Sequence, residues 1–188
     1  MFATVRGRMG AAGSRGAEER PLHRGDGVMA GDRVVRPARA EDLAALVEVG
    51  RRSWLSAFAQ TAPFALIAWW VREDRTRVLY EQCWAEMWVL EEDARIIGLV
   101  QPRADEVNGL WIHPERQGTG AGTLLLRTAE ELIRRDGHEA AWLTCSAFNA
   151  AALRFYAGRG YVETGRTGSV HCSGVEIEDV RMARRLVA

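Results

Sequence analysis

A glycine-rich loop that runs directly into a helical pattern is the feature of this chain that most constrains its fold. Residues 115–126 read ERQGTGAGTLLL, with glycine at positions 118, 120 and 122. The helical pattern that follows has one apolar face, made by Leu125, Ala129, Leu132 and Ile133. A backbone without side chains at the start of a helix lets several N–H groups converge on an anion, helped by the helix dipole. A phosphate group is therefore the ligand that this stretch favours.

The glycine spacing does not match the common nucleotide-binding fingerprints. Gly118, Gly120 and Gly122 give G-x-G-x-G, whereas the dinucleotide fingerprint is G-x-G-x-x-G with an acidic residue at the end of the next strand. The chain contains no lysine, which excludes a P-loop and a lysine Schiff base. One structural alternative stays open, in which the glycines serve only a tight turn between a strand and a helix.

The composition indicates one domain without a strong net charge. The 188 residues, of which 47% are hydrophobic, suffice for one domain with a core. The 25 basic residues balance 25 acidic ones, so no net field attracts nucleic acid or an acidic membrane surface. No apolar run approaches the roughly 18 residues of a membrane span, and the four histidines lack a metal-ligand spacing. We expect a cytoplasmic protein without a metal, in which Cys83, Cys145 and Cys172 are reduced.

The first 28 residues differ in composition from the rest of the chain. They hold six glycines and five arginines and almost no large apolar side chains, so they cannot bury enough surface to offset the entropy of ordering. We expect residues 1–28 to be a disordered tail, or an untranslated leader with Met29 as the true start, and residues 32–188 to form the domain.

Periodicity along the domain predicts a mixed α/β fold. A short strand, RVVRPA, precedes a helix in AEDLAALVEVGRRSW, and two less regular helices are expected near residues 64–71 and 76–84. MWVLEE and RIIGLVQ form a predicted hairpin with Asp93-Ala94 at its turn. In the next strand, VNGLWIHP, the alternation slips at Asn108-Gly109, which indicates a β-bulge. After the helix that follows the glycines, a buried strand, a short helix and two further strands complete the sheet.

Four stretches in the right order resemble one protein family. LWIHPERQGTGAGTLLL resembles the acetyl-coenzyme A signature of the GNAT superfamily of N-acetyltransferases, Q/R-x-x-G-x-G/A, through Gln117, Gly120 and Gly122. NAAALRFYAGRGYVETG is similar to the second signature of that family, VVRPARAEDLAAL to its opening strand and helix, and RIIGLV to its third strand. The likeness covers about residues 34–186 and is weakest over 55–85.

The resemblance implies both a fold and a reaction. It implies a single-domain α/β fold with a mixed, mostly antiparallel sheet that is splayed between strands 4 and 5 and flanked by helices. It also implies transfer of an acetyl group from acetyl-coenzyme A, a cosubstrate, to a primary amine in a ternary complex. The acceptor would be a small molecule or a peptide, and a homodimer is compatible with the pattern. The alternative is a related domain that binds acyl-coenzyme A as a sensor without turnover.

The resemblance also assigns a cosubstrate site. The pyrophosphate would lie on the glycine loop, on the main chain of Gln117, Gly118, Thr119, Gly120, Ala121, Gly122 and Thr123. The pantetheine arm would run like an extra strand along the backbone near Trp111 and Ile112. Asn149 would anchor a pantetheine amide.

Two residues are candidates for the proton transfers. Asn149, Ala152 and Tyr156 are spaced by three and four positions and share one helical face, and the resemblance implies that Tyr156 reaches the sulfur as the acid. Glu106, just before the predicted bulge, is the implied base. The structural alternatives are a tyrosine that packs its ring in the core and an exposed carboxylate at a strand end.

Other residues have weaker support for a role. His171 could act as a base or line the acceptor pocket, and Cys145 could carry an acetyl group, although a solvated loop histidine and a small buried thiol are the simpler interpretations. Four aromatic residues fall where the family varies its acceptor site, and most of them are expected in the core: Trp54, Phe58, Trp69 and Trp70.

Overall fold

The computed structural model describes residues 28–30, 33–170 and 174–186. Residues 1–27 lie outside the described part, so the predicted tail stays a prediction, and His171 and Cys172 lie outside it as well. In chain order the elements are β1 Val28–Ala30, β2 Arg33–Pro37, α1 Leu43–Phe58, α2 Phe64–Arg72, α3 Arg75–Cys83, β3 Trp88–Glu92, β4 Arg95–Arg103, β5 Glu106–Ile112, α4 Ala121–Arg135, β6 Ala140–Ser146, α5 Ala150–Ala157, β7 Val162–Val170 and β8 Glu176–Arg185, with short 3₁₀ turns at Ala40–Asp42, Trp84–Glu86 and Pro114–Arg116.

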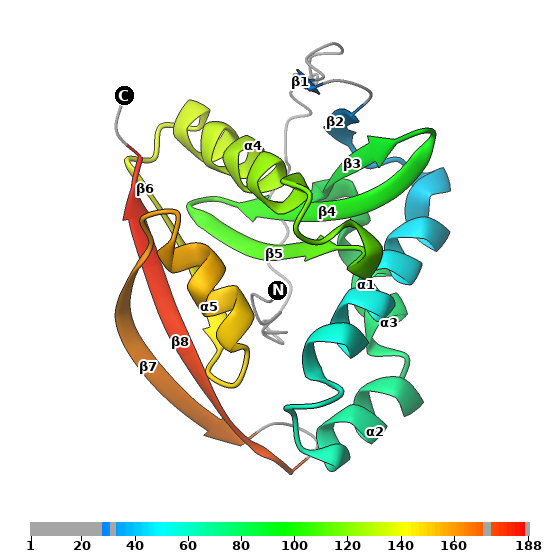
Figure 1. Cartoon of the computed structure of the whole chain (residues 1–188), viewed down its shortest axis with the longest axis vertical. Helices are drawn as coiled ribbons and strands as arrows, with labels where there is room; N and C mark the ends of the chain where they lie inside the picture. The colour runs from blue at the N-terminus through cyan, green and yellow to red at the C-terminus, as the bar shows by residue number, and fades with distance from the viewer. Residues whose placement is uncertain (1–27, 31–32, 171–173, 187–188) are drawn as a thin grey trace, which may run out of the picture.

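The strands form one mixed sheet, in the order β1-β2-β3-β4-β5-β6-β8-β7. Every neighbouring pair is antiparallel except β5 and β6, which are parallel and share a single register position, Glu106 opposite Trp142. Beyond that point the two strands diverge, as Figure 1 shows. The predicted α/β fold and the splay between the fourth and fifth predicted strands are confirmed. These strands are β5 and β6 because β1, which was not predicted, adds one strand at the edge.

The predicted bulge is present in β5. Gln101 of β4 pairs with Gly109, but the next residue, Pro102, pairs with Val107. Asn108 is therefore the extra residue, and its insertion turns the strand locally. The predicted hairpin turn is also confirmed, since Asp93 and Ala94 have φ of 51° and 58° and connect β3 to β4.

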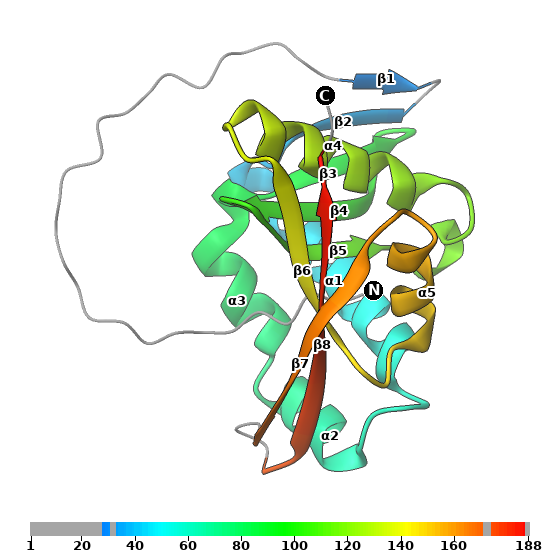
Figure 2. The ribbon, with the colours of Figure 1, turned by 90° about the vertical axis from the view of Figure 1, so that its left-hand side faces the viewer.

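Helices cover both faces of the sheet and create two apolar clusters. The α4 and α5 helices pack on one face, where Leu125 and Tyr156 join residues of β2–β6 and β8 in one cluster. On the other face α1, α2 and α3 form a second cluster around Leu46 and Trp54. Figure 2 shows α3 and α5 on either side of the strands β6, β7 and β8.

Gly98 of β4 allows the end of β5 and the start of α4 to pack closely. A Cβ atom at this position would lie 2.7 Å from Ile112 Cδ1, 2.9 Å from Leu125 Cδ1 and 3.0 Å from the carbonyl oxygen of Trp111. Because one of these neighbours is backbone, the contact cannot be relieved by a side-chain rotation alone. Gly98 thus lets the end of β5 and the Leu125 side chain of α4 lie close to β4.

We expect Gly98→Ala to destabilise the fold by about 1–3 kcal/mol, the usual cost of overpacking a core. Thermal unfolding of the variant measures this change. Gly168→Ala in β7 is the matched control, since a Cβ there meets nothing within 4 Å, and its stability should stay within about 0.5 kcal/mol of the unchanged chain. Equal effects of the two substitutions would contradict the packing argument.

Candidate functional site

The glycine loop presents a row of free main-chain donors at the start of α4. Gly118 and Gly120 have φ of 77° and 87°, and a Cβ on either would meet no atom within 4 Å. Within the described residues, the main-chain N–H groups of residues 118–122 donate to no acceptor. No acidic residue lies in the first turn of α4, so the positive end of the helix dipole is not offset there. This arrangement suits a phosphate.

A cavity of about 380 Å³ lies beside these donors. Its walls come from four parts of the chain that are distant in sequence: α1, the end of β5, the glycine loop and α5. The lining residues are Ser56, Ala57, Ile112, Gln117, Gly118, Gly120, Gly122, Thr123, Asn149, Ala151, Ala152, Phe155 and Arg159. Seven of the predicted cosubstrate residues therefore share one cavity.

Asn149 has two roles at the start of α5. Its Oδ1 accepts a hydrogen bond from the Ala152 N–H at 3.1 Å and so caps the helix. Its Nδ2 is buried and has no hydrogen-bond partner in the described residues. An unpaired buried donor at a cavity wall is costly unless a ligand supplies the acceptor. A ligand carbonyl in the cavity would satisfy it.

The end of β5 turns backbone groups towards the gap between β5 and β6. The His113 N–H donates to the Ile97 carbonyl of β4 at 2.8 Å, so alternation along the strand directs the Ile112 groups to the other side. The Ile112 carbonyl accepts from Ser53 Oγ at 2.7 Å and from Gln117 Nε2 at 3.2 Å. The side chain of Trp111 packs in the cluster of α1–α3, and the same alternation directs its backbone groups to Leu99 of β4.

The outer side of the loop is held by an arginine of β2. Arg33 donates to the carbonyl oxygen of Thr119 at 2.9 Å and to its Oγ1 at 3.1 Å. Glu92 accepts from Arg33 and from Arg116, and the hydrogen bond from Arg33 lowers the pKa of Glu92 below its ordinary value. Thr119 and Ala121 do not line the cavity, so their predicted part in binding would rest on their main chain alone.

Arg159 is a residue of the site that the sequence did not predict. It follows α5, and its guanidinium lies 3.6 Å above the ring of Phe155 and donates to Thr123 Oγ1. No carboxylate among the described residues forms an ion pair with it. Burial lowers the pKa of Arg159, and the charge of Arg127 lowers it further. The i, i+4 spacing from Phe155 was the signal that could have placed it on this face.

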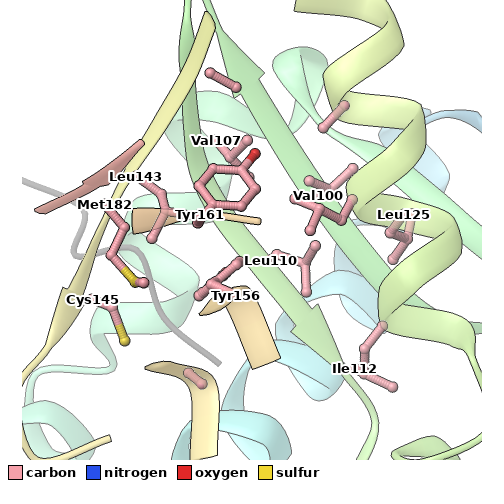
Figure 3. Close-up of a cluster of buried hydrophobic side chains, with 14 of the residues drawn as sticks. Val100, Val107, Leu110, Ile112, Leu125, Leu143, Cys145, Tyr156, Tyr161 and Met182 are labelled. Carbon is pink, nitrogen blue, oxygen red and sulfur yellow. The ribbon is translucent and has the colours of Figure 1, made fainter. Parts of the chain in front are cut away.

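Tyr156 lies behind the cavity and does not line it. Its side chain is 0% exposed, and its hydroxyl has no hydrogen-bond partner in the described residues. Burial raises the pKa of the hydroxyl well above its ordinary value, and Cys145 and Tyr161 raise it further. Figure 3 shows Tyr156 and Tyr161 among apolar side chains, with Cys145 nearby. The hydroxyl is therefore a protonated donor within the packed region between β5 and β6.

Glu106 lines a separate cavity of about 210 Å³, at the end where β5 and β6 are still paired. The other lining residues are Arg103, Asn108, Trp142, Thr144, Thr167 and Arg181. The guanidinium of Arg181 lies 4.1 Å from the ring centre of Trp142. The glycine loop and Asn149 thus lie at one cavity. The two predicted catalytic residues, Tyr156 and Glu106, do not line that cavity.

The remaining candidates lie mostly in the core. Cys145 is 0% exposed, as a small buried thiol would be. Trp54 is 3% exposed and stacks on Trp70 at 4.7 Å between ring centres. Phe58 is also buried, and Trp69 is partly buried against the same cluster. These aromatic residues shape the α1–α2 layer, as expected for most of them.

The described residues contain no helix that is both long and apolar enough to cross a membrane. In the same part of the chain, no group of three or more His, Cys, Asp or Glu side chains is arranged to hold a metal ion.

Several solved structures share this fold. A GCN5-related N-acetyltransferase from Rhodopseudomonas palustris aligns with a TM-score of 0.73 and 21% identity, over 85% of this chain and 99% of the other. The PaiA N-acetyltransferase from Thermoplasma acidophilum, in complex with coenzyme A, aligns with a TM-score of 0.62 and 22% identity, over 82% and 99%. The ribosomal-protein-S18-alanine N-acetyltransferase from Escherichia coli gives 0.61 and 19%, over 83% and 95%.

Sequence comparison points to the same family. A search of curated protein sequences found no match. The family model described as the acetyltransferase (GNAT) family matches residues 44–161, which is more than half of the chain and includes the glycine loop and α5. The chain therefore belongs to the GNAT family of acetyltransferases.

Proposed function

We propose that this protein transfers an acetyl group from acetyl-coenzyme A directly to a primary amine. The observation that carries the proposal is the row of free N–H groups at residues 118–122, which faces a cavity at the positive end of α4. In the family to which the chain belongs, the cosubstrate is held at such a loop. The acceptor would be a small molecule or a peptide with a free amino group.

The residues at the cavity fit the chemical parts of acetyl-coenzyme A. The pyrophosphate would accept hydrogen bonds from the loop main chain, and the guanidinium of Arg159 at the same wall adds a positive charge. The Nδ2 of Asn149 would donate to a pantetheine carbonyl and gain the partner that it lacks. The backbone of Ile112 would pair with the arm as a neighbouring strand does. From there the thioester would reach the gap between β5 and β6.

The reaction needs one proton acceptor and one proton donor. The amine nitrogen attacks the thioester carbonyl carbon, a C–N bond forms, and the C–S bond breaks. Glu106 takes the proton that nitrogen loses, directly or through water, and Tyr156 gives its proton to the departing sulfur. Both groups then return to their starting states by exchange with solvent. The hydroxyl carries the proton in the free protein, but burial raises its pKa and makes it a weaker acid until the sulfur enters the gap.

One observation favours the alternative of a sensor that binds acyl-coenzyme A without turnover. Tyr156 and Glu106 both lie outside the cavity of the glycine loop, so a proton path would have to form when the cosubstrate enters the gap. A sensor would bind acetyl-coenzyme A but release no thiol when amines are added.

A screen of amine classes tests the proposed function. Purified protein is mixed with acetyl-coenzyme A and with spermidine, an alanine-initiated peptide, an aminoglycoside or an α-amino acid, and thiol release is followed with time. We expect at least one amine to give catalytic release together with an acetylated product in the mass spectrum. Binding of acetyl-coenzyme A without release above background for any amine would support the sensor instead.

We expect acetyl-coenzyme A to raise the melting temperature by mass action, and Gly120→Glu to abolish that rise. The glutamate would place a side chain and a like charge in the path of the phosphates. Gly137→Glu is the matched control, because Gly137 lies just past the other end of α4 with φ of 90° and similar open space. Both variants carry the same backbone strain, but only the control should keep the ligand-induced rise. Retention of the rise in folded Gly120→Glu would argue against the site.

We expect Tyr156→Phe to lower kcat by about 100- to 10,000-fold, the usual effect of removing a positioned acid, with little change in acetyl-coenzyme A affinity because the ring still packs. Tyr161→Phe is the control and should keep most activity, since this neighbouring hydroxyl is also buried but lies beside Glu130. Cys145→Ala should keep most activity. Normal turnover of Tyr156→Phe, with an inactive Cys145→Ala and acetyl label retained on the protein, would show that the cysteine carries the acetyl group.

A further inference from the structure

A chain of three polar side chains connects the protein surface to the bulge in β5. Asn108 Nδ2 donates to Gln101 Oε1 at 2.9 Å, and Gln101 Nε2 donates to Glu86 Oε2 at 2.8 Å. Gln101 and Asn108 are only 3% and 6% exposed, whereas Glu86 is exposed in the turn before β3. Buried amides of this kind need partners, and these two find them in each other and in the carboxylate.

Glu86 fixes the orientation of both amide groups in this row of hydrogen-bonded side chains. A carboxylate accepts hydrogen bonds and donates none, so Gln101 must turn its NH₂ group towards Glu86. The Gln101 carbonyl then faces Asn108 and requires the NH₂ group of Asn108. Asn108 can rotate only by giving up this bond, and its Oδ1 is therefore held on the side away from Gln101.

The free oxygen of Asn108 belongs to the cavity that contains Glu106. Asn108 is the extra residue of the bulge, and it lines that cavity two positions from Glu106. No described residue donates a hydrogen bond to its Oδ1. This oxygen is not fully buried, and the cavity that Asn108 lines gives access to it. The cavity thus offers a directed acceptor beside a carboxylate, at the point where β5 and β6 part.

We infer that Asn108 Oδ1 accepts a hydrogen bond from the nitrogen of the acceptor amine, and that Gln101 and Glu86 are positioning residues that keep this oxygen turned towards it. The inference rests on the proposed acetyl transfer. A neutral primary amine carries two N–H groups. One is directed to Asn108 Oδ1, which aims the nitrogen lone pair at the thioester, and the other supplies the proton that leaves after attack. A reversed Asn108 would instead point N–H groups at the amine and repel its hydrogens.

Glu86→Gln tests whether the orientation of the two amides matters. Glutamine keeps the shape of the glutamate side chain but can also donate a hydrogen bond. Both amide groups can then turn over, and Asn108 would present its NH₂ group to the cavity. With the amine that gives the highest kcat/KM in the screen, the KM for the amine should rise by about 2- to 10-fold, as for the loss of one neutral hydrogen bond. The KM for acetyl-coenzyme A and the melting temperature should stay unchanged. Glu81 is an exposed carboxylate of α3 that is not hydrogen-bonded to Gln101 or Asn108. The control Glu81→Gln should therefore change neither KM.

Asn108→Asp separates orientation from general packing. An aspartate offers an oxygen whichever way it turns, so adding Glu86→Gln in that background should cause no rise in the amine KM, a non-additivity that reports coupling. If Asn108→Asp fails to fold, Gln101→Met removes the carbonyl that holds Asn108 and should raise the amine KM by the same factor as Glu86→Gln.

The outcomes distinguish this inference from the proposed function. The inference is overturned if Glu86→Gln leaves the amine KM unchanged, or if it raises that KM equally with and without Asn108→Asp. Acetyl transfer by the unchanged protein would still uphold the proposed function in either case. If the unchanged protein acetylates no amine in the screen, the proposed function fails and the inference fails with it.

Discussion

The single register position that joins β5 to β6 is the constraint on which the site depends. Because Glu106 and Trp142 are the only register pair between these strands, the second half of β5 has backbone groups that no neighbouring strand satisfies. Such groups must find other partners, and the Ile112 carbonyl does so through Ser53 and Gln117. The opening is stable because each helical layer has its own apolar cluster. The gap is thus a built feature that an extended ligand can complete.

The bulge and the glycine loop lie at opposite ends of this opening. Asn108 turns β5 where the strands begin to part, and the free donors of residues 118–122 follow the other end of β5, at the start of α4. A long ligand with phosphates at one end and a reactive group at the other suits that separation. The two cavities, one with Asn149 and the other with Glu106, would then hold the two substrates of one transfer.

Local sequence patterns predicted the elements well because they depend on neighbouring residues. The turn at Asp93-Ala94 and the bulge at Asn108 both follow from residue types within a few positions. The resemblance to the family signature then assigned the glycine loop to the cosubstrate. Contacts between distant residues were not predictable in this way. Arg159 reaches Thr123 across 36 positions, and β1 is too short at three residues to show any periodicity.

The burial of Tyr156 illustrates the same limit. Its helical spacing predicted that it shares one face of the helix with Asn149, but spacing does not report how closely β6 and β8 pack around its ring. In the structure the hydroxyl lies beside Cys145 and Tyr161 without a partner among the described residues. A ligand sulfur in the gap would give it one, and this is the point at which fold and proposed chemistry meet.

A crystal structure of the protein with acetyl-coenzyme A would test the central claim most directly. We predict that the pyrophosphate lies on the main-chain N–H groups of residues 118–122, and that the thioester lies between β5 and β6 with its sulfur within hydrogen-bond reach of the Tyr156 hydroxyl. A cosubstrate bound elsewhere, or one whose thioester stays outside the gap while Tyr156 remains without a partner, would contradict this account.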